Sequence, residues 1–176
     1  MFRNLFLCAL FLLIYACGQT DNVDLSDKYL TEKVIYQSKN IFGFENLFDG
    51  RIMSQADQDV FGILHFPNNY DASIQYPLVI ASHGSSNWRD HHRRYLEQMR
   101  QADYLVFAIH PFDSRDVSST VGNQINVTSE TVIYEMAQAL NLMSKDSRVD
   151  NQKIFAAGWS LGGTASLFNG WVPLQD

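Results

Sequence analysis

The sequence predicts an α/β domain in which a mostly parallel sheet carries helices on both faces. Continuous apolar runs at 78–81, 105–109 and 154–157 are typical of strands buried on both faces of a parallel sheet. Helical periods separate these runs, so strands and helices alternate along the chain. With 176 residues, 46% hydrophobic and 18% charged, the chain is long enough for one domain with a sizeable core.

Residues 1–17 are expected to be an export signal and not part of that domain. Arg3 precedes an apolar run from Leu5 to Ala16, which ends directly before Cys17. This arrangement resembles the lipobox of bacterial lipoproteins, which implies that Cys17 receives a lipid and becomes the mature N-terminus. We therefore expect a protein attached to a membrane on its periplasmic or cell-surface side, with residues 18–30 as a polar tether. Ordinary secretion and an uncleaved anchor are the alternatives.

The composition argues against two other features. The formal charge of −6 and the pI near 5.2 provide no basic patch large enough to neutralise many phosphates, so we expect no nucleic-acid partner. Cys8 lies within the expected signal segment, so the two cysteines are not expected to form a disulfide in the mature protein.

Two short strands are predicted before the parallel part of the sheet, at Lys33–Tyr36 and Asp59–Pro67. Both are expected to be antiparallel edge strands. The helix after the 78–81 strand is predicted from a shared face; its members are Trp88, Tyr95, Met99 and Ala102. The helix after the 105–109 strand is predicted in the same way, with a cap at Thr128–Glu130; its face consists of Val132, Met136, Leu140 and Met143.

The segment Pro111–Val127 is rich in Asp, Ser, Thr, Asn and Gly, which predicts a loop. It follows the carboxyl end of a parallel strand, and in open α/β sheets ligands bind at that edge. The simplest interpretation is a mobile surface loop without specific contacts, with Asp113 and Asp116 as part of its polarity.

The run Gly158-Trp159-Ser160-Leu161-Gly162-Gly163 directly follows the third apolar run. A glycine two positions before and two positions after a serine is typical of a nucleophile elbow, a sharp turn between a strand and a helix. The small neighbours leave room for the strained turn, and the start of the helix favours negative charge on the serine oxygen. The alternative is an ordinary strand-to-helix turn in which Ser160 only caps the helix.

A second motif lies upstream, where the 78–81 strand continues into Ser82-His83-Gly84-Ser85. A His-Gly turn after a buried strand is where such folds place a second backbone donor for an oxyanion. The pair His-Gly is common by itself, and its position ahead of the Ser160 run makes it informative.

Together these motifs resemble the α/β-hydrolase superfamily, and most closely its dienelactone-hydrolase-like branch with its exported serine esterases. The resemblance covers roughly residues 62–168. It implies the α/β-hydrolase fold, with Ser160 as the nucleophile and the backbone N–H groups of Leu161 and Ser85 as oxyanion donors. It implies no metal or cofactor.

The other members of the catalytic triad do not match. In that superfamily the acid and the histidine follow the serine, on loops after later strands. All five histidines of this chain precede Ser160, and Asp176 is the one acidic residue after it. Residues 31–176 are thus expected to form the N-terminal part of a hydrolase domain, C-terminally truncated, which folds marginally and has no turnover by itself.

The upstream histidines have simpler interpretations than catalysis. His83 is expected to make a structural hydrogen bond in its turn and not to act as the base. His91 and His92 are expected to lie at a solvated helix start, since adjacent helical residues point about 100° apart and do not easily hold one ion. His110 either faces the substrate or packs against Pro111.

The sequence thus favours a serine hydrolase acting on carboxylic esters, either small molecules or polymers. A serine peptidase of the same fold is one alternative, although relatives of that kind need a large accessory domain. A non-catalytic lipoprotein that uses the scaffold for binding is the other.

Overall fold

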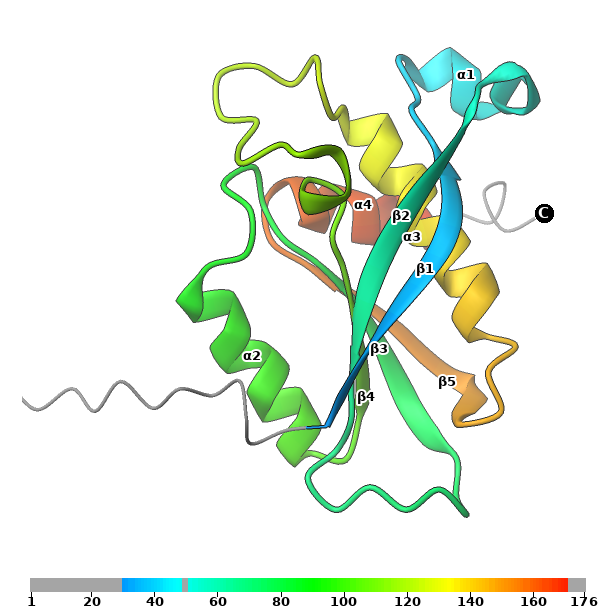
Figure 1. Cartoon of the computed structure of the whole chain (residues 1–176), viewed down its shortest axis with the longest axis vertical. Helices are drawn as coiled ribbons and strands as arrows, with labels where there is room; N and C mark the ends of the chain where they lie inside the picture. The colour runs from blue at the N-terminus through cyan, green and yellow to red at the C-terminus, as the bar shows by residue number, and fades with distance from the viewer. Residues whose placement is uncertain (1–29, 49–50, 171–176) are drawn as a thin grey trace, which may run out of the picture.

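The computed structural model describes residues 30–48 and 51–170, which form one mixed five-stranded sheet with helices on both faces (Figure 1). The strands are β1 (Thr31–Lys39), β2 (Asp57–His65), β3 (Tyr76–Ser82), β4 (Leu105–Ile109) and β5 (Val149–Gly158). The helices are α1 (Phe44–Phe48), α2 (Asp90–Gln101), α3 (Ser129–Met143) and α4 (Leu161–Asn169), and two short 3₁₀ turns are η2 (Arg51–Ser54) and η3 (Asp113–Arg115).

The strand order is β1-β2-β4-β3-β5. The three predicted apolar runs form the parallel part, because β3 pairs in parallel with both β4 and β5. The two N-terminal strands are antiparallel, as expected, but the prediction that both lie at an edge is wrong for β2. It pairs with β1 along its whole length and with β4 through Gly62–His65, so β1 is the edge strand.

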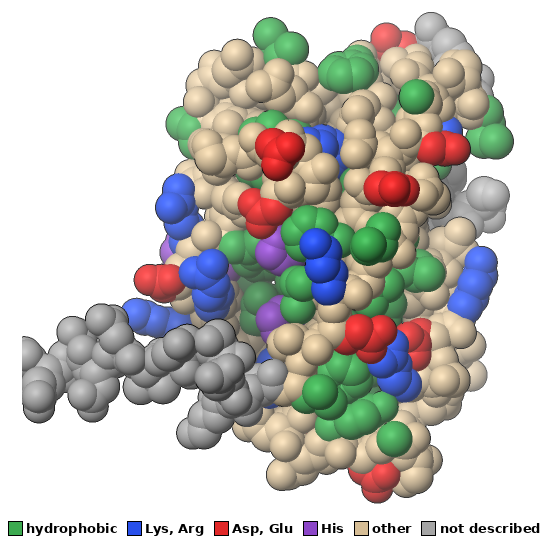
Figure 2. Space-filling view, viewed as in Figure 1, with side chains coloured by type: hydrophobic (Ala, Val, Ile, Leu, Met, Phe, Trp, Pro, Cys, Tyr) green, Lys and Arg blue, Asp and Glu red, His purple; other side chains and the backbone are tan. Residues whose placement is uncertain are grey.

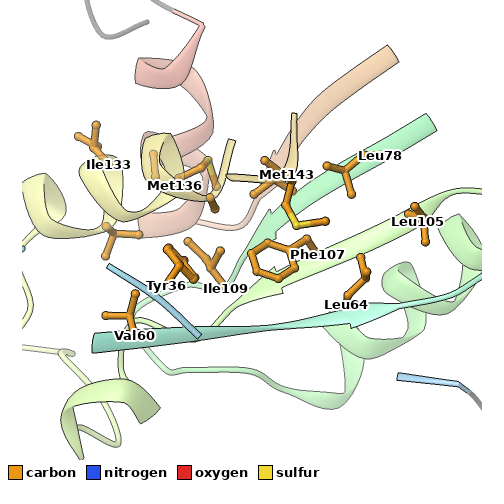
Figure 3. Packing of buried hydrophobic residues seen from close by; sticks show 14 of the residues in the cluster. Tyr36, Val60, Leu64, Leu78, Leu105, Phe107, Ile109, Ile133, Met136 and Met143 are labelled. Carbon is orange, nitrogen blue, oxygen red and sulfur yellow. The ribbon is translucent and has the colours of Figure 1, made fainter. Parts of the chain in front are cut away.

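The two faces of the sheet contribute to two separate cores. On one face, α3 and α4 pack against the larger core, in which Phe107 of β4 is fully buried between neighbours such as Tyr36, Leu64 and Met136 (Figure 3). On the other face, Leu96 of α2 packs in a smaller core; its members are Ala81, Trp88, Leu96, Val106 and Ala108. The alternation of side chains along a strand explains why β4 contributes to both cores.

Two residues of the predicted face, Trp88 and Met99, pack in the smaller core, but the other two do not, because helix α2 buries a different row of side chains. Its buried residues are His92, Leu96 and Arg100, whereas Tyr95 is 50% exposed. Arg100 occupies a position on the inner face where an apolar residue was expected. Its guanidinium group is hydrogen-bonded there, since Nε donates to the carbonyl of Phe66 at 2.6 Å. Paired burial of this kind is tolerated, since the charge keeps its hydrogen bonds.

The predicted face of α3 is confirmed. Val132, Met136 and Met143 are each 1% exposed, and Leu140 packs at the margin of the same core. Thr128 caps the helix by accepting a hydrogen bond from the N–H of Thr131, as the sequence predicts.

In the described part of the chain, none of the helices has the length and apolar character needed to cross a membrane. Residues 1–29 lie outside it, and with them the predicted signal segment and tether.

Candidate active site

The Gly158–Gly163 run forms a sharp turn from β5 into α4. Ser160 stands at the turn with φ +52° and ψ −113°, a left-handed backbone that a residue with a side chain adopts only under strain. The turn is fixed by hydrogen bonds from Trp159 N to Ser82 O at 3.2 Å and from Gly162 N to Trp159 O at 3.0 Å. Ser160 is exposed at the tip of this turn.

Two glycines make the turn possible through close backbone contacts. A Cβ atom on Gly158 would collide with the backbone of Gly162, and a Cβ atom on Gly162 would collide with the carbonyl groups of Ser82 and His83. Both clashes involve backbone, which cannot move aside as a flexible side chain can. The glycine spacing that predicted the turn thus reflects steric necessity.

The alternative role of Ser160, as a simple helix cap, does not fit this geometry. A capping serine accepts a hydrogen bond from the backbone at the second or third helical position. Ser160 is the N-cap residue of α4, but its side chain makes no such bond. Its side chain is therefore exposed and is not used to start the helix.

The two backbone groups predicted as oxyanion donors belong to the start of α4 and to the turn after β3. Leu161 is the first residue of α4, so its N–H is one of those that a helix leaves without an internal partner. Ser85 belongs to the Gly84–Asn87 turn, which is closed by a 3.0 Å hydrogen bond from Asn87 N to Gly84 O. A Cβ atom on Gly84 would be only 3.3 Å from the Cβ of Ser160, so the turn directly adjoins the serine.

His83 is buried beneath that turn. Its ring is 1% exposed and lies edge-on to Phe112 and Trp88, with centroids 4.5 Å and 5.4 Å away. Nδ1 lies 2.8 Å from the carbonyl oxygen of Gly84, and since a carbonyl only accepts, Nδ1 carries the proton. Burial lowers the pKa of His83 to about 4, so the ring is neutral at pH 7.

The sequence did not predict a side-chain cluster that follows β4. His110 Nδ1 lies 2.7 Å from Asp113 Oδ2, and Asn87 Nδ2 donates to Asp113 Oδ1 at 2.7 Å. The expectation that His110 packs against Pro111 is replaced by a stack on Phe61, with ring centroids 4.9 Å apart. The spacing of His110 and Asp113 within one turn of chain was the available signal.

The surroundings of His110 and Asp113 determine the protonation state of both side chains. Burial lowers the pKa of His110 below its usual value, although Asp113 acts in the opposite direction. Burial alone would raise the pKa of Asp113, but hydrogen bonds from His110 and Asn87 outweigh it and hold that pKa below normal. At neutral pH the pair is thus a carboxylate that accepts from a neutral imidazole.

The Pro111–Val127 segment makes specific contacts, so the interpretation as a loop without them is wrong. It contains η3, and it reaches the Gly84–Asn87 turn through Thr120 N, which donates to Ser85 O at 2.9 Å. Asp116 is an exposed residue in left-handed conformation at the end of η3.

The start of α2 is solvated, as predicted, except at one residue. His91 is exposed, but His92 is 4% exposed and packs on Trp159, with ring centroids 4.9 Å apart. An open depression of about 570 Å³ lies here, and Ser160 is not among its lining residues, which are Trp88, Arg89, Asp90, His91 and Arg93.

Within residues 30–48 and 51–170 no group of three or more His, Cys, Asp or Glu side chains could hold a metal ion. The predicted lipidation site, Cys17, lies outside the described residues.

Comparisons with known proteins bear on the fold. No protein-family model and no curated protein matches the sequence. Among solved structures, m3DLH matches with a TM-score of 0.52 and 18% identity over 82% of this chain and 53% of its own. A dienelactone-hydrolase-like promiscuous phosphotriesterase from metagenomic libraries matches with a TM-score of 0.48 and 17% identity over 81% of this chain and 53% of its own. Dipeptidyl peptidase 4 of Porphyromonas gingivalis matches with a TM-score of 0.50 and 16% identity over 79% of this chain and 18% of its own.

The structural match to m3DLH establishes the fold. The described chain has an α/β-hydrolase-like arrangement, with a partly parallel five-stranded sheet and helices on both faces. The chain spans about half the length of the first two of these structures.

Proposed function

We propose that this chain provides the nucleophile and the oxyanion donors of a serine hydrolase that acts on carboxylic esters. The observation that carries the proposal is the backbone of Ser160, which is strained, exposed and in contact with the Gly84–Asn87 turn. A strained residue whose side chain makes no capping bond is typical of a functional position. The hydrolase-like fold supports the same conclusion.

In this proposal Ser160 Oγ attacks the ester carbonyl carbon while its proton passes to a base. The negative charge that develops on the carbonyl oxygen is held by the N–H groups of Leu161 and Ser85. Collapse of the intermediate expels the alcohol, which takes up the proton, and water then cleaves the acyl-serine by the same steps. Nothing in these steps requires a metal or cofactor.

The base is not one of the described histidines in this proposal. His83 is enclosed by aromatic rings, and its Nδ1–H donates a hydrogen bond to the carbonyl oxygen of Gly84. His110 stacks on β2 and uses its Nδ1 for Asp113, and β3 lies between its strand and that of Ser160. We therefore propose that a histidine and an acid from a continuation of the chain complete the site.

The test compares two polypeptides: the 176-residue chain and the product of the reading frame continued beyond codon 176. With a short-chain p-nitrophenyl ester, we expect hydrolysis by the extended polypeptide that Ser160→Ala abolishes and Ser118→Ala leaves unchanged. The 176-residue chain is expected to show none. Ser160-dependent hydrolysis by the short chain would overturn the assignment of the base. An extended polypeptide with a downstream histidine but no such hydrolysis would overturn the esterase proposal, and a stop after codon 176 favours a non-catalytic binding protein.

A peptidase of the same fold is the second candidate, because dipeptidyl peptidase 4 matches this chain. Its match covers only 18% of that protein. Replacing the ester by a dipeptidyl p-nitroanilide separates the two candidates.

We also propose that Cys17 anchors the protein to a membrane through a lipid, on the basis of the sequence pattern alone. Metabolic labelling with a radioactive fatty acid tests this proposal. Label that persists in Cys17→Ala would contradict it.

A further inference from the structure

The Gly84–Asn87 turn is not held in place by its own residues alone. Asn87 adopts φ +67°, a left-handed conformation that asparagine tolerates better than most residues but that still costs free energy. Its side chain also accepts a hydrogen bond from the N–H of Trp88 at 2.6 Å. A turn of this kind keeps its shape only where its surroundings determine it.

Residues 113–120, which follow β4, form hydrogen bonds with this turn at Ser85 and at Asn87. The carbonyl of Ser85 accepts from Thr120 N at 2.9 Å and from Ser119 Oγ at 3.0 Å. The side-chain amide of Asn87 donates to Asp113 at 2.7 Å. Both ends of the turn are thus tied to residues 113–120, which lie far from it in sequence.

Asp113 is itself fixed from both sides. His110 holds its second carboxylate oxygen. Two residues further on, Arg115 donates to the carbonyl of Pro111 and to Glu135 of α3, at 2.8 Å and 2.7 Å. The carboxylate is consequently a rigid point to which Asn87 can attach.

We propose that Asp113 is a positioning residue that, through Asn87, sets the orientation of the Ser85 N–H toward Ser160. It touches no substrate, and the role of the N–H rests on the proposed function. The cluster of His110, Asp113 and Asn87 is thereby assigned to the shape of the oxyanion site and not to proton transfer with Ser160. Asp113 is 42% exposed, so its effect is moderate.

The first test does not depend on catalysis. Amide exchange measured by NMR on the 176-residue chain follows two hydrogen-bonded amides, Asn87 N and Thr120 N. We expect Asp113→Ala to accelerate their exchange about tenfold, the change that corresponds to one lost hydrogen bond. Asp113→Asn keeps an oxygen that accepts from Asn87 and is expected to restore protection. Ser118→Ala, an exposed change in the same segment, is the control.

Exchange of the Phe107 amide in β4 reports on global unfolding and separates a local effect from a loss of fold. Asn87→Gly is the second variant, since glycine keeps the left-handed backbone accessible but lacks the amide. It is expected to accelerate exchange at Thr120 as Asp113→Ala does. Unchanged exchange at both reporter amides in Asp113→Ala, with β4 intact, would overturn the proposal.

The second test uses the extended polypeptide with the p-nitrophenyl ester. A donor that is aimed incorrectly weakens binding of the transition state, so Asp113→Ala is expected to lower kcat about tenfold with KM changed less than about twofold. Asp113→Asn is expected to recover most of kcat. A rise in KM at constant kcat would overturn the positioning role, whereas absence of any Ser160-dependent hydrolysis concerns only the proposed function.

Discussion

β4 and β5 are both parallel neighbours of β3, yet they differ sharply in burial. All five residues of β4 are buried, whereas Phe155 at the centre of β5 is 50% exposed. β4 is paired on both sides, by β2 and β3, while β5 pairs with β3 alone among the described strands. In the space-filling view apolar side chains also remain visible beside α2 (Figure 2). An apolar run therefore predicts a strand, but the elements that pack beside the strand determine whether it is buried.

The largest expected effect contrasts phenylalanines at these two positions. Phe107→Ala removes a fully buried ring and is expected to cost about 3–5 kcal/mol of unfolding free energy, or to prevent folding. Phe155→Ala is expected to cost less than about 1.5 kcal/mol, because half of its ring already meets water. Urea unfolding followed by circular dichroism measures both. Equal costs would show that β5 is covered in solution.

A second contrast lies within the turn that carries Ser160. Gly158→Ala forces a Cβ atom against the backbone of Gly162 and is expected to lower stability by about 2–3 kcal/mol. Gly163→Ala is the matched control, since its Cβ would be 3.3 Å from Gly158 O and alanine favours the helix. The difference between their thermal midpoints checks the prediction. It is contradicted if Gly158→Ala is as stable as Gly163→Ala.

A fall in pH is expected to destabilise the interior strands more than the edge strand. Burial lowers the pKa of both His65, at the end of β2, and His83, after β3, to about 4. Their contribution to stability is fully present above about pH 6.5 and is lost as the pH falls toward 4.

Glu135 acts in the opposite direction, because burial raises its pKa to about 7 despite Arg115. Its contribution is present below about pH 4.5 and is lost as the pH rises toward 7. Two histidines outweigh one carboxyl group, so unfolding free energy is expected to fall by about 1–2 kcal/mol per pH unit between pH 6 and 5. Thermal midpoints at both pH values test this. Glu135→Gln removes the opposing group, so its midpoint should fall more steeply, and a midpoint independent of pH would contradict the prediction.

The smallest expected effect concerns strain at Ser160. Glycine at this position accepts φ +52° without strain, whereas alanine does not. Ser160→Gly is therefore expected to be more stable than Ser160→Ala by about 1 kcal/mol, in spite of the greater freedom of glycine in the unfolded chain. Paired urea titrations give this difference directly. A more stable Ser160→Ala would show that the turn relaxes.

Much of the fold could be predicted because the signals are local. The apolar runs gave the parallel strands, the period of Val132, Met136 and Met143 gave the buried face of α3, and glycine spacing gave the turn at Ser160. Each of these depends on residues that are neighbours in the chain.

What could not be predicted depends on distant partners. The inner face of α2 includes Arg100 because the carbonyl of Phe66, on another element, satisfies its charge. Asn87 and Asp113 meet because two parallel strands end at the same edge of the sheet, and neither residue type indicates the other. The inner place of β2 likewise follows from pairing with β4 and not from its own sequence pattern.

The pairing of β3 with β5, which joins Leu78 to Ile154, has a consequence for the order of folding. Pairing of β3 with β5 closes a long loop of chain. The resulting loss of conformational entropy is compensated only after β4 and α3, which lie between the two strands in sequence, have folded. Among the described strands β5 is paired on one side only, as β1 is. We therefore expect the Phe155 amide to exchange with solvent before that of Phe107. The turn that carries Ser160 is then among the last parts of the domain to assemble and the first to be lost.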